Sequence, residues 1–199
     1  TPTLKVADNE KTRTHLYELL AQRISGFVEP SYIGDDMLRG IEDEIYARAA
    51  YEENFGAVTE CGFITNDRWS FSIGYSPDGL VGADGLIETK SRRQKYQVQT
   101  ILEHVATGCK SIPAEYVLQA QTGLLVSERA WLDFISYSAG LPMCVIRVYP
   151  DARVQDAIIT AAEEFEAQLD SKYGVYRAAL RSPARLVETE RRIVQELYV

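Results

Sequence analysis

The sequence predicts an α/β fold with a central mixed β-sheet flanked by helices. Two observations support this prediction: long stretches repeat apolar residues at helical spacing, and shorter stretches between them have the composition and bounding turns of β-strands. The order along the chain is helices, strands, helices, strands and a final helical stretch, which is typical of layered α/β domains. With 199 residues the chain can bury a substantial core, and we expect residues 1–199 to form a single domain.

The first half of the chain is predicted to contain two helices and four strands. A helix is expected over residues 10–26, where Gly26 ends it. A second helix is expected over residues 35–55, and Gly56 ends it. Its buried stripe should consist of Leu38, Ile41, Ile45 and Ala49. The strands should lie near residues 59–65, 69–75, 78–82 and 86–91.

The second half is predicted to continue the same layered pattern. Helices are expected over residues 94–106 and 113–126, with Pro113 in the first turn of the latter. Strands near residues 131–138 and 143–149 would complete the sheet. From residue 151 onward a helical apolar stripe begins, and residues 184–198 have a helical pattern too.

Composition and charge exclude several classes of protein. No apolar run approaches the ~20 residues of a membrane span, and no secretory signal is visible, so we expect a cytoplasmic protein. Cys61, Cys109 and Cys144 are too few and too far apart for a disulfide framework or a four-ligand iron–sulfur site. The net charge of −8 argues against DNA binding by the whole surface, although a local groove can still be basic.

The strongest functional pattern lies in the two strands that flank residues 83–85. The Asp-Gly pair in that segment is typical of a tight hairpin turn, which would place Asp78 opposite a position within one residue of Glu88. Directly opposed side chains have Cβ atoms roughly 4.5–5.5 Å apart. Alternation along the second strand puts Glu88 and Lys90 on one face and Thr89 on the other. Two carboxylates and one ammonium group should therefore converge.

These residue types suit metal-dependent hydrolysis of a phosphodiester. Mg²⁺ prefers oxygen ligands and usually takes only one or two carboxylates from a protein. Between Asp78 and Glu88 it would polarise a phosphoryl oxygen and lower the pKa of a bound water. Lys90 would orient that water or neutralise charge on the phosphate. The alternative is a solvated surface hairpin, which the Pro-Asp start, the hairpin spacing and the apolar lining disfavour.

Residues 74–90 resemble the PD-(D/E)xK nuclease motif in the form found in the lambda exonuclease family of phage recombination nucleases. Four further blocks resemble that family in the same order, at residues 20–26, 39–52, 116–121 and 131–137. The resemblance implies a restriction endonuclease-like core and a Mg²⁺-dependent deoxyribonuclease, with Mn²⁺ as a possible substitute and one or two ions bound. It also implies a 5′→3′ exonuclease that acts on linear double-stranded DNA during phage-type recombination in a bacterial host.

The resemblance assigns roles that the spacing of residues leaves open. Glu42 and Glu44 both flank the apolar stripe of their helix, and the resemblance selects Glu44 as the metal-proximal acid. Gln119 matches a family glutamine beside the active site. The main-chain carbonyl of Thr89 would join Asp78 and Glu88 as a metal ligand.

A basic cluster follows the catalytic lysine, and its role stays open. Arg92, Arg93 and Lys95 would bind DNA phosphates beside the metal, or they would form a solvated strand exit. The family usually has a Cys-Pro pair where Ser91 and Arg92 stand here.

The family also carries an earlier segment that contributes to a pocket for the terminal 5′-phosphate. We expect this segment to be absent here, which leaves the exonuclease polarity open. Two other functions remain: a PD-(D/E)xK endonuclease, and a DNA-binding recombination module that does not cut. The expected partners are double-stranded DNA, a single-strand annealing protein and two further copies of this chain in a homotrimeric ring, with no membrane.

Overall fold

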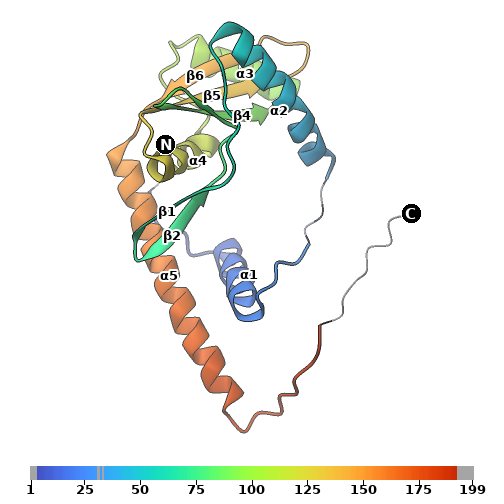
Figure 1. The fold of residues 1–199 in the computed structure, drawn as a ribbon, viewed down its shortest axis with the longest axis vertical. Coiled ribbons are helices and arrows are strands. Elements are labelled where there is room, and N and C mark those ends of the chain that lie inside the picture. The colour runs from blue at the N-terminus through green and yellow to red at the C-terminus, as the bar shows by residue number, and fades with distance from the viewer. Residues whose placement is uncertain (1–3, 31, 33, 192–199) are drawn as a thin grey trace, which may run out of the picture. The chain divides into compact units, whose positions relative to one another are not determined.

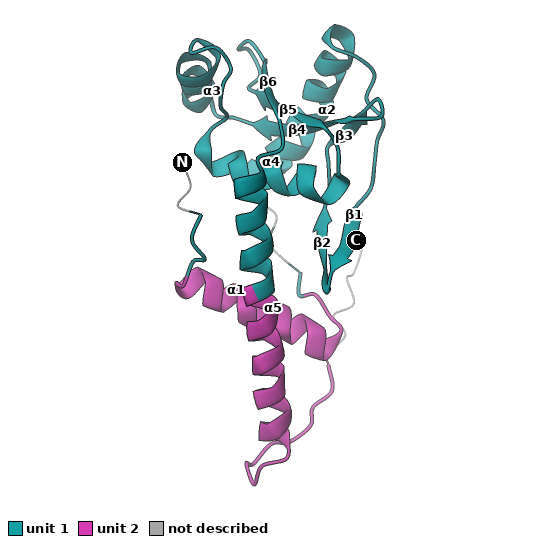
Figure 2. Ribbon diagram, turned by 90° about the vertical axis from the view of Figure 1, so that its left-hand side faces the viewer, with its two compact units in different colours: residues 1–7, 29–163 teal, residues 8–28, 164–199 magenta. Residues whose placement is uncertain are grey.

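The computed structural model describes residues 4–30, 32 and 34–191. The chain divides into two compact units, one made of residues 1–7 and 29–163 and the other of residues 8–28 and 164–199 (Figure 2). Each unit has its own apolar cluster and is described separately below. A single nuclease domain over the whole chain stays a prediction. None of the described helices is long and apolar enough to cross a membrane.

The first unit is built on a four-stranded mixed sheet, which confirms the predicted α/β class (Figure 1). Its strands are β3 (Gly79–Val81), β4 (Gly85–Ser91), β5 (Trp131–Tyr137) and β6 (Cys144–Val148), in that spatial order. The central pair β4 and β5 is parallel, and both outer pairings are antiparallel. Because parallel neighbours need a long crossover, the chain between β4 and β5 forms helices.

Helices cover both faces of this sheet. Helix α2 (Asp35–Asn54) packs on the face of Ile87 and Ile135, where its Ala47 and Tyr51 are buried. Helix α4 (Ala114–Ser127) packs on the opposite face. The apolar side chains of that second face are Leu86, Leu132, Phe134, Ala120 and Leu124. Alternation along β4 therefore sends successive side chains toward α2 and α4 in turn.

The crossover begins with α3 (Gln94–Thr100), which continues into the π-helical segment η1 (Ile101–Val105). Gln97 of α3 is buried, and its amide donates to the main-chain oxygen of Ser136 at 3.0 Å. This contact anchors the predicted helix over residues 94–106 to β5.

A separate antiparallel ribbon of β1 (Ile64–Trp69) and β2 (Phe71–Tyr75) lies against α4. The close approach depends on Gly123 of α4, because a Cβ there would lie 2.6 Å from the ring of Tyr75. The ribbon thereby places Tyr75, at its end, inside the core beside β4.

In the second unit, α1 (Glu10–Ser25) packs on the part of α5 (Ala152–Leu180) that belongs to the same unit. Asn9 caps α1 by accepting a hydrogen bond from the N–H of Thr12. Gly26 ends it in the left-handed conformation, as the sequence predicted. Leu16 and Leu20 bury their side chains against Leu169.

The predicted buried stripe of α2 is wrong. Leu38, Ile41 and Ile45 are each more than half exposed, and Ala49 is also exposed. Periodicity identifies an apolar face but not what packs against it. The helix instead turns its small Ala47 and Tyr51 to the sheet, and Asp43, Glu44 and Arg48 of its next face are partly buried beside the hairpin.

Two further predicted elements differ from the structure. The expected strand over residues 59–65 reduces to one bridge, in which Thr59 and Leu80 exchange main-chain hydrogen bonds of 2.8 and 2.9 Å, and β1 starts only at Ile64. The expected helix over residues 184–198 is not formed in residues 184–191, and residues 192–199 lie outside the described residues. Leu186 and Val187 are exposed there. Without an apolar surface to pack on, so short a helix is not stable.

Candidate active site

The hairpin of β3 and β4 has the register that the sequence predicted. Leu80 lies opposite Leu86 and Gly79 opposite Ile87, so the next pair outward is Asp78 and Glu88. The turn occupies residues 82–84, one residue earlier than expected, and Gly82 takes a left-handed conformation with φ of 54°.

Asp78 is held by the main chain of the opposite strand. Its Oδ2 accepts a hydrogen bond from the N–H of Thr89 at 2.5 Å. Burial and the negative charge of Glu88 raise the pKa of Asp78 to about 7, and the charge of Glu44 adds to this, while the Thr89 N–H and Lys90 act in the opposite direction. The structure therefore brings the carboxylate of Glu44 into electrostatic range of Asp78.

Glu88 is the most enclosed acid of the site, with 2% of its surface exposed. Three side chains donate hydrogen bonds to it. The Tyr75 hydroxyl binds Oε2, and Oε1 accepts from Lys90 Nζ at 2.5 Å and from Gln119 Nε2 at 2.6 Å. Burial, followed by the charge of Glu88, raises the pKa of Tyr75, so its hydroxyl keeps its proton.

The predicted alternation along β4 is confirmed. Glu88 and Lys90 contact each other on the α4 side, where the Lys90 ammonium lies 5.6 Å from the centre of the Tyr116 ring. Thr89 is buried, and its Oγ1 has no hydrogen-bond partner among the described residues. Its main-chain N–H binds Asp78, so its part in the site is through the backbone.

Glu44 enters from α2 and has a positive partner of its own. Arg48, one turn further along α2, donates to Glu44 at 2.9 Å and to Glu60 at 2.6 Å. Arg48 is mostly buried, and its Nε has no partner among the described residues. The pair fixes Glu44 on the side of α2 that faces the hairpin.

A polar cluster ties α2 to the end of β4. The Ser91 hydroxyl donates to Asp43 Oδ2 at 2.5 Å and accepts from Arg39 Nε at 3.0 Å. Because Asp43 precedes Glu44 in the chain, this contact ties the part of α2 that carries Glu44 to the end of β4.

The three predicted DNA-binding cations have different environments. Arg92 is buried and donates to the Tyr116 hydroxyl at 2.5 Å and to Glu115 at 3.1 Å. Arg93 is exposed and pairs with Asp36 at 3.1 Å, and the exposed Lys95 lies 4.7 Å from the ring centre of Tyr96. A side chain must be exposed to contact a DNA phosphate. Of these three cations, only Arg93 and Lys95 are exposed.

The oxygen donors of the hairpin fit a hard divalent cation. Within the part of the chain that the structure describes, no three His, Cys, Asp or Glu side chains gather closely enough to hold a metal by themselves. Asp78 and Glu88 are nevertheless adjacent across the hairpin, where burial and then the charge of Glu88 raise the pKa of Asp78. Two carboxylates and a carbonyl are enough for Mg²⁺, which usually keeps several waters.

Sequence reasoning missed several residues that position this site. They are Tyr75, Tyr116, Asp43, Ser91 and Arg48. Tyr75 stands three positions before Asp78, at the end of an alternating strand, but nothing in that pattern shows that its hydroxyl reaches Glu88.

Comparison with known proteins gives consistent results. The family described as the YqaJ-like viral recombinase domain matches residues 5–130, which contain Glu44, Asp78, Glu88, Lys90 and Gln119. The alkaline exonuclease LHK-Exo from Laribacter hongkongensis is 33% identical over 88% of each chain, with a TM-score of 0.76. Its complex with dAMP gives the same values.

A phage related exonuclease from Haemophilus somnus 129PT shares the fold, with 15% identity over 82% of this chain and 84% of that one and a TM-score of 0.54. No curated protein matches the chain.

Proposed function

Because the chain belongs to the YqaJ-like viral recombinase family, a lambda exonuclease-like group with the PD-(D/E)xK fold, we propose that it is a Mg²⁺-dependent deoxyribonuclease that degrades linear double-stranded DNA. The observation that carries the proposal is the convergence of Asp78, Glu88 and Lys90 on one hairpin, with Gln119 and Tyr75 bonded to the same glutamate.

Each polar side chain of the hairpin has a proposed role. Asp78, Glu88 and the Thr89 carbonyl would hold one ion, and Asp78 with Glu44 a second. Bound Mg²⁺, or Mn²⁺ in its place, would supply Lewis-acid stabilisation of a phosphoryl oxygen and a water of lowered pKa. Lys90 would compensate negative charge that develops on the phosphate. Gln119 and Tyr75 hold the Glu88 carboxylate in one orientation, as ligand-supporting side chains do in metal sites.

Direction and biological context are the finer parts of the proposal. We propose 5′→3′ polarity and a role in phage-type recombination in the cytoplasm of a bacterial host, on the strength of the family. A homotrimeric ring around DNA and a single-strand annealing partner belong to the same proposal. Mass from light scattering at micromolar concentration tests the ring, and a monomer would contradict it.

Incubation with linear and closed circular duplex DNA tests the central claim. Linear DNA should shorten from its ends with Mg²⁺ and stay intact with EDTA, while circles survive. Nicking of circles would instead support an endonuclease, and tight binding of both forms without turnover would support a module that does not cut. Phosphorothioate linkages placed at only the 5′ or only the 3′ ends would then test the polarity, because only a block at the attacked end should stop degradation.

A further inference from the structure

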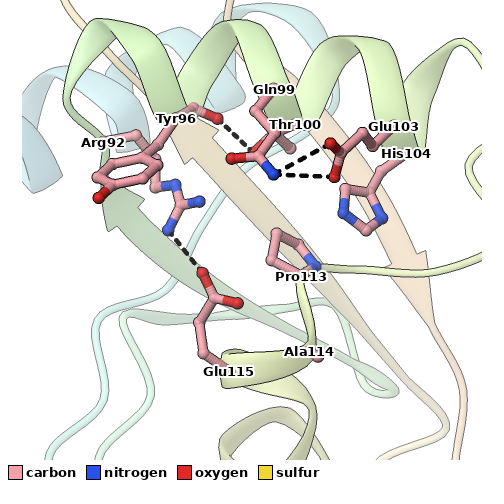
Figure 3. Close-up of a pocket in the computed structure, with 9 residues that line it drawn as sticks. All are labelled: Arg92, Tyr96, Gln99, Thr100, Glu103, His104, Pro113, Ala114 and Glu115. Carbon is pink, nitrogen blue, oxygen red and sulfur yellow. Dashed lines mark hydrogen bonds and ion pairs between the residues drawn. The ribbon is translucent and has the colours of Figure 1, made fainter. Parts of the chain in front are cut away.

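A cavity of about 370 Å³ opens beside the proposed site, between α3 with η1 and the start of α4 (Figure 3). Its walls come from the beginning of the crossover and from the first residues of α4. The side chains that matter for its chemistry are Arg92, Tyr96, Gln99, Glu103, Pro113 and Glu115. No role proposed above for metal binding or hydrolysis uses this volume.

The cavity lies close to the proposed site of cleavage, at a distance that a few nucleotides of a bound DNA strand would span. The Arg92 guanidinium carbon is 5.1 Å from the centre of the Tyr116 ring, and Lys90 Nζ is 5.6 Å from the same ring centre. The two cations are therefore at most about 11 Å apart. A stacked strand advances about 3.4 Å per nucleotide, so this distance corresponds to no more than about three nucleotides.

The walls combine donors, acceptors and an aromatic ring. Arg92 is 8% exposed, and its Nε lacks a hydrogen-bond partner among the described residues. The guanidinium is held 5.2 Å from the ring centre of Tyr96, and Tyr96 itself is 41% exposed. Gln99 donates to both carboxylate oxygens of Glu103 at 3.0 Å, which leaves its amide oxygen as an acceptor.

The charge of the walls argues against an isolated phosphate as the occupant. One cation, Arg92, stands against the carboxylates of Glu103 and Glu115. A phosphate would meet two like charges there, whereas phosphate sites on DNA-binding proteins carry an excess of Lys and Arg. The volume also exceeds what one phosphate group fills. A neutral, planar and polar group with both donors and acceptors matches the walls better.

We propose that this cavity receives an unpaired base of the DNA strand that is being cut. The inference rests on the proposed nuclease function and extends it to a base-binding subsite. Tyr96 offers a ring for stacking, as aromatic side chains do for splayed bases. Glu115 is 57% exposed and bonded to Arg92, so a base edge can take its place on the guanidinium. Arg and Glu side chains both bind base edges in known readout.

Abasic nucleotides combined with a Tyr96→Ala variant test the proposal. Short linear duplexes carry an abasic nucleotide at the first, second or third position from the 5′ end, and binding is measured by fluorescence anisotropy. Ca²⁺ replaces Mg²⁺ because it binds oxygen sites but positions water poorly for turnover. In the native protein one abasic position should weaken binding about tenfold. Tyr96→Ala should weaken binding of intact DNA by a similar factor and make that abasic position nearly neutral.

Further variants separate stacking from a loss of structure. Tyr96→Phe keeps the ring and should behave as the native protein. Gln99→Leu leaves Tyr96 and Arg92 in place and should lower affinity only for DNA with a base at the sensitive position. Tyr173→Ala removes a ring of similar exposure on α5 and serves as the control. Circular dichroism confirms that each variant is folded.

The outcomes distinguish this inference from the nuclease proposal. Abasic effects that are equal at all positions, or equal in native and Tyr96→Ala protein, would overturn the base subsite and leave a backbone contact only. Hydrolysis of linear DNA with Mg²⁺, measured in parallel, would then still support the nuclease. Position-specific coupling without any hydrolysis would keep the subsite and overturn the nuclease.

Discussion

The Asp78 carboxylate accepts a hydrogen bond from the main-chain N–H of Thr89, the residue that follows Glu88 on the neighbouring strand. This contact fixes one carboxylate by the backbone beside the other, and burial of the pair raises the pKa of Asp78 to about 7. The same hairpin thus determines both the geometry and the charge of the site.

Asp78→Ala should abolish hydrolysis without unfolding the protein, because Asp78 is not one of the side chains that form the apolar clusters. Loss of a supporting residue in a metal site costs about 10–100-fold, so loss of a direct ligand should cost at least a hundredfold. Lys90→Ala should also inactivate the enzyme. Degradation of linear DNA with Mg²⁺ is the measurement. Undiminished activity of Asp78→Ala would exclude the proposed site, and Asp84→Ala in the turn is the matched control.

The stability of the metal-free protein should fall as pH rises from about 4 to about 7. Folded Asp78 keeps its proton up to about pH 7, whereas the unfolded chain loses it near the ordinary value of 3.8. The folded state therefore binds more protons in this window, and the free energy of unfolding decreases by at most about 4 kcal/mol, then levels off. Urea unfolding in EDTA at several pH values measures this decrease in the free energy of unfolding. Asp78→Asn keeps the acceptor for Thr89 and should remove this slope; an unchanged slope would contradict the assignment.

Metal binding should become weaker at acidic pH, because a cation between Asp78 and Glu88 must displace the proton that Asp78 holds below about pH 7. Calorimetric titration with Mg²⁺ in buffers of different ionisation enthalpy should detect proton release. If the affinity for Mg²⁺ did not change between about pH 5.5 and about pH 8, Asp78 would not be a ligand.

Glu44→Gln should lower the affinity for a second metal ion more than the affinity for the first. The charge of Glu44 reaches Asp78 but ranks below that of Glu88 among the causes of its raised pKa. A calorimetric titration that resolves two binding events should lose the weaker one and retain the stronger. If both events persist in the Glu44→Gln protein, Glu44 is not a ligand of the second ion, although two ions still bind; a single event in the native protein would contradict the two-ion form. Glu42→Gln on the same helix is the control.

Tyr75→Phe should lower both stability and metal affinity. The hydroxyl is bonded to a buried carboxylate, and loss of such a bond costs about 1.5–3 kcal/mol. Without this donor Glu88 keeps only the two hydrogen bonds at Oε1, from Lys90 and Gln119, and its Oε2 is no longer fixed. Loss of such a supporting contact should weaken metal binding about 10–100-fold. Urea unfolding and calorimetry measure the two effects. Tyr149→Phe, on an exposed ring, should change neither; equal effects from both substitutions would refute the role of Tyr75.

Sequence alone determined the parts of this protein that depend on local periodicity. The two-residue repeat in β4 placed Glu88 and Lys90 on one face, and the turn signal placed Asp78 opposite a position within one residue of Glu88. The structure decided the exact pair, because its turn lies at residues 82–84. Both placements follow from backbone geometry within a short stretch of chain. The order of the helices and strands was predictable for the same reason, apart from the strand expected over residues 59–65 and the helix expected over residues 184–198.

Only the tertiary structure decided which helix face meets the sheet and which side chains complete the site. The apolar residues of α2 predicted a buried stripe, yet the helix presents Ala47 and Tyr51 to the sheet. Tyr75 reaches Glu88 because the ribbon packs on α4 at Gly123, and Ser91 reaches Asp43 because α2 crosses the end of β4. These contacts join residues that are far apart in the chain or on different elements, and their geometry depends on the packing of the whole unit rather than on any local repeat.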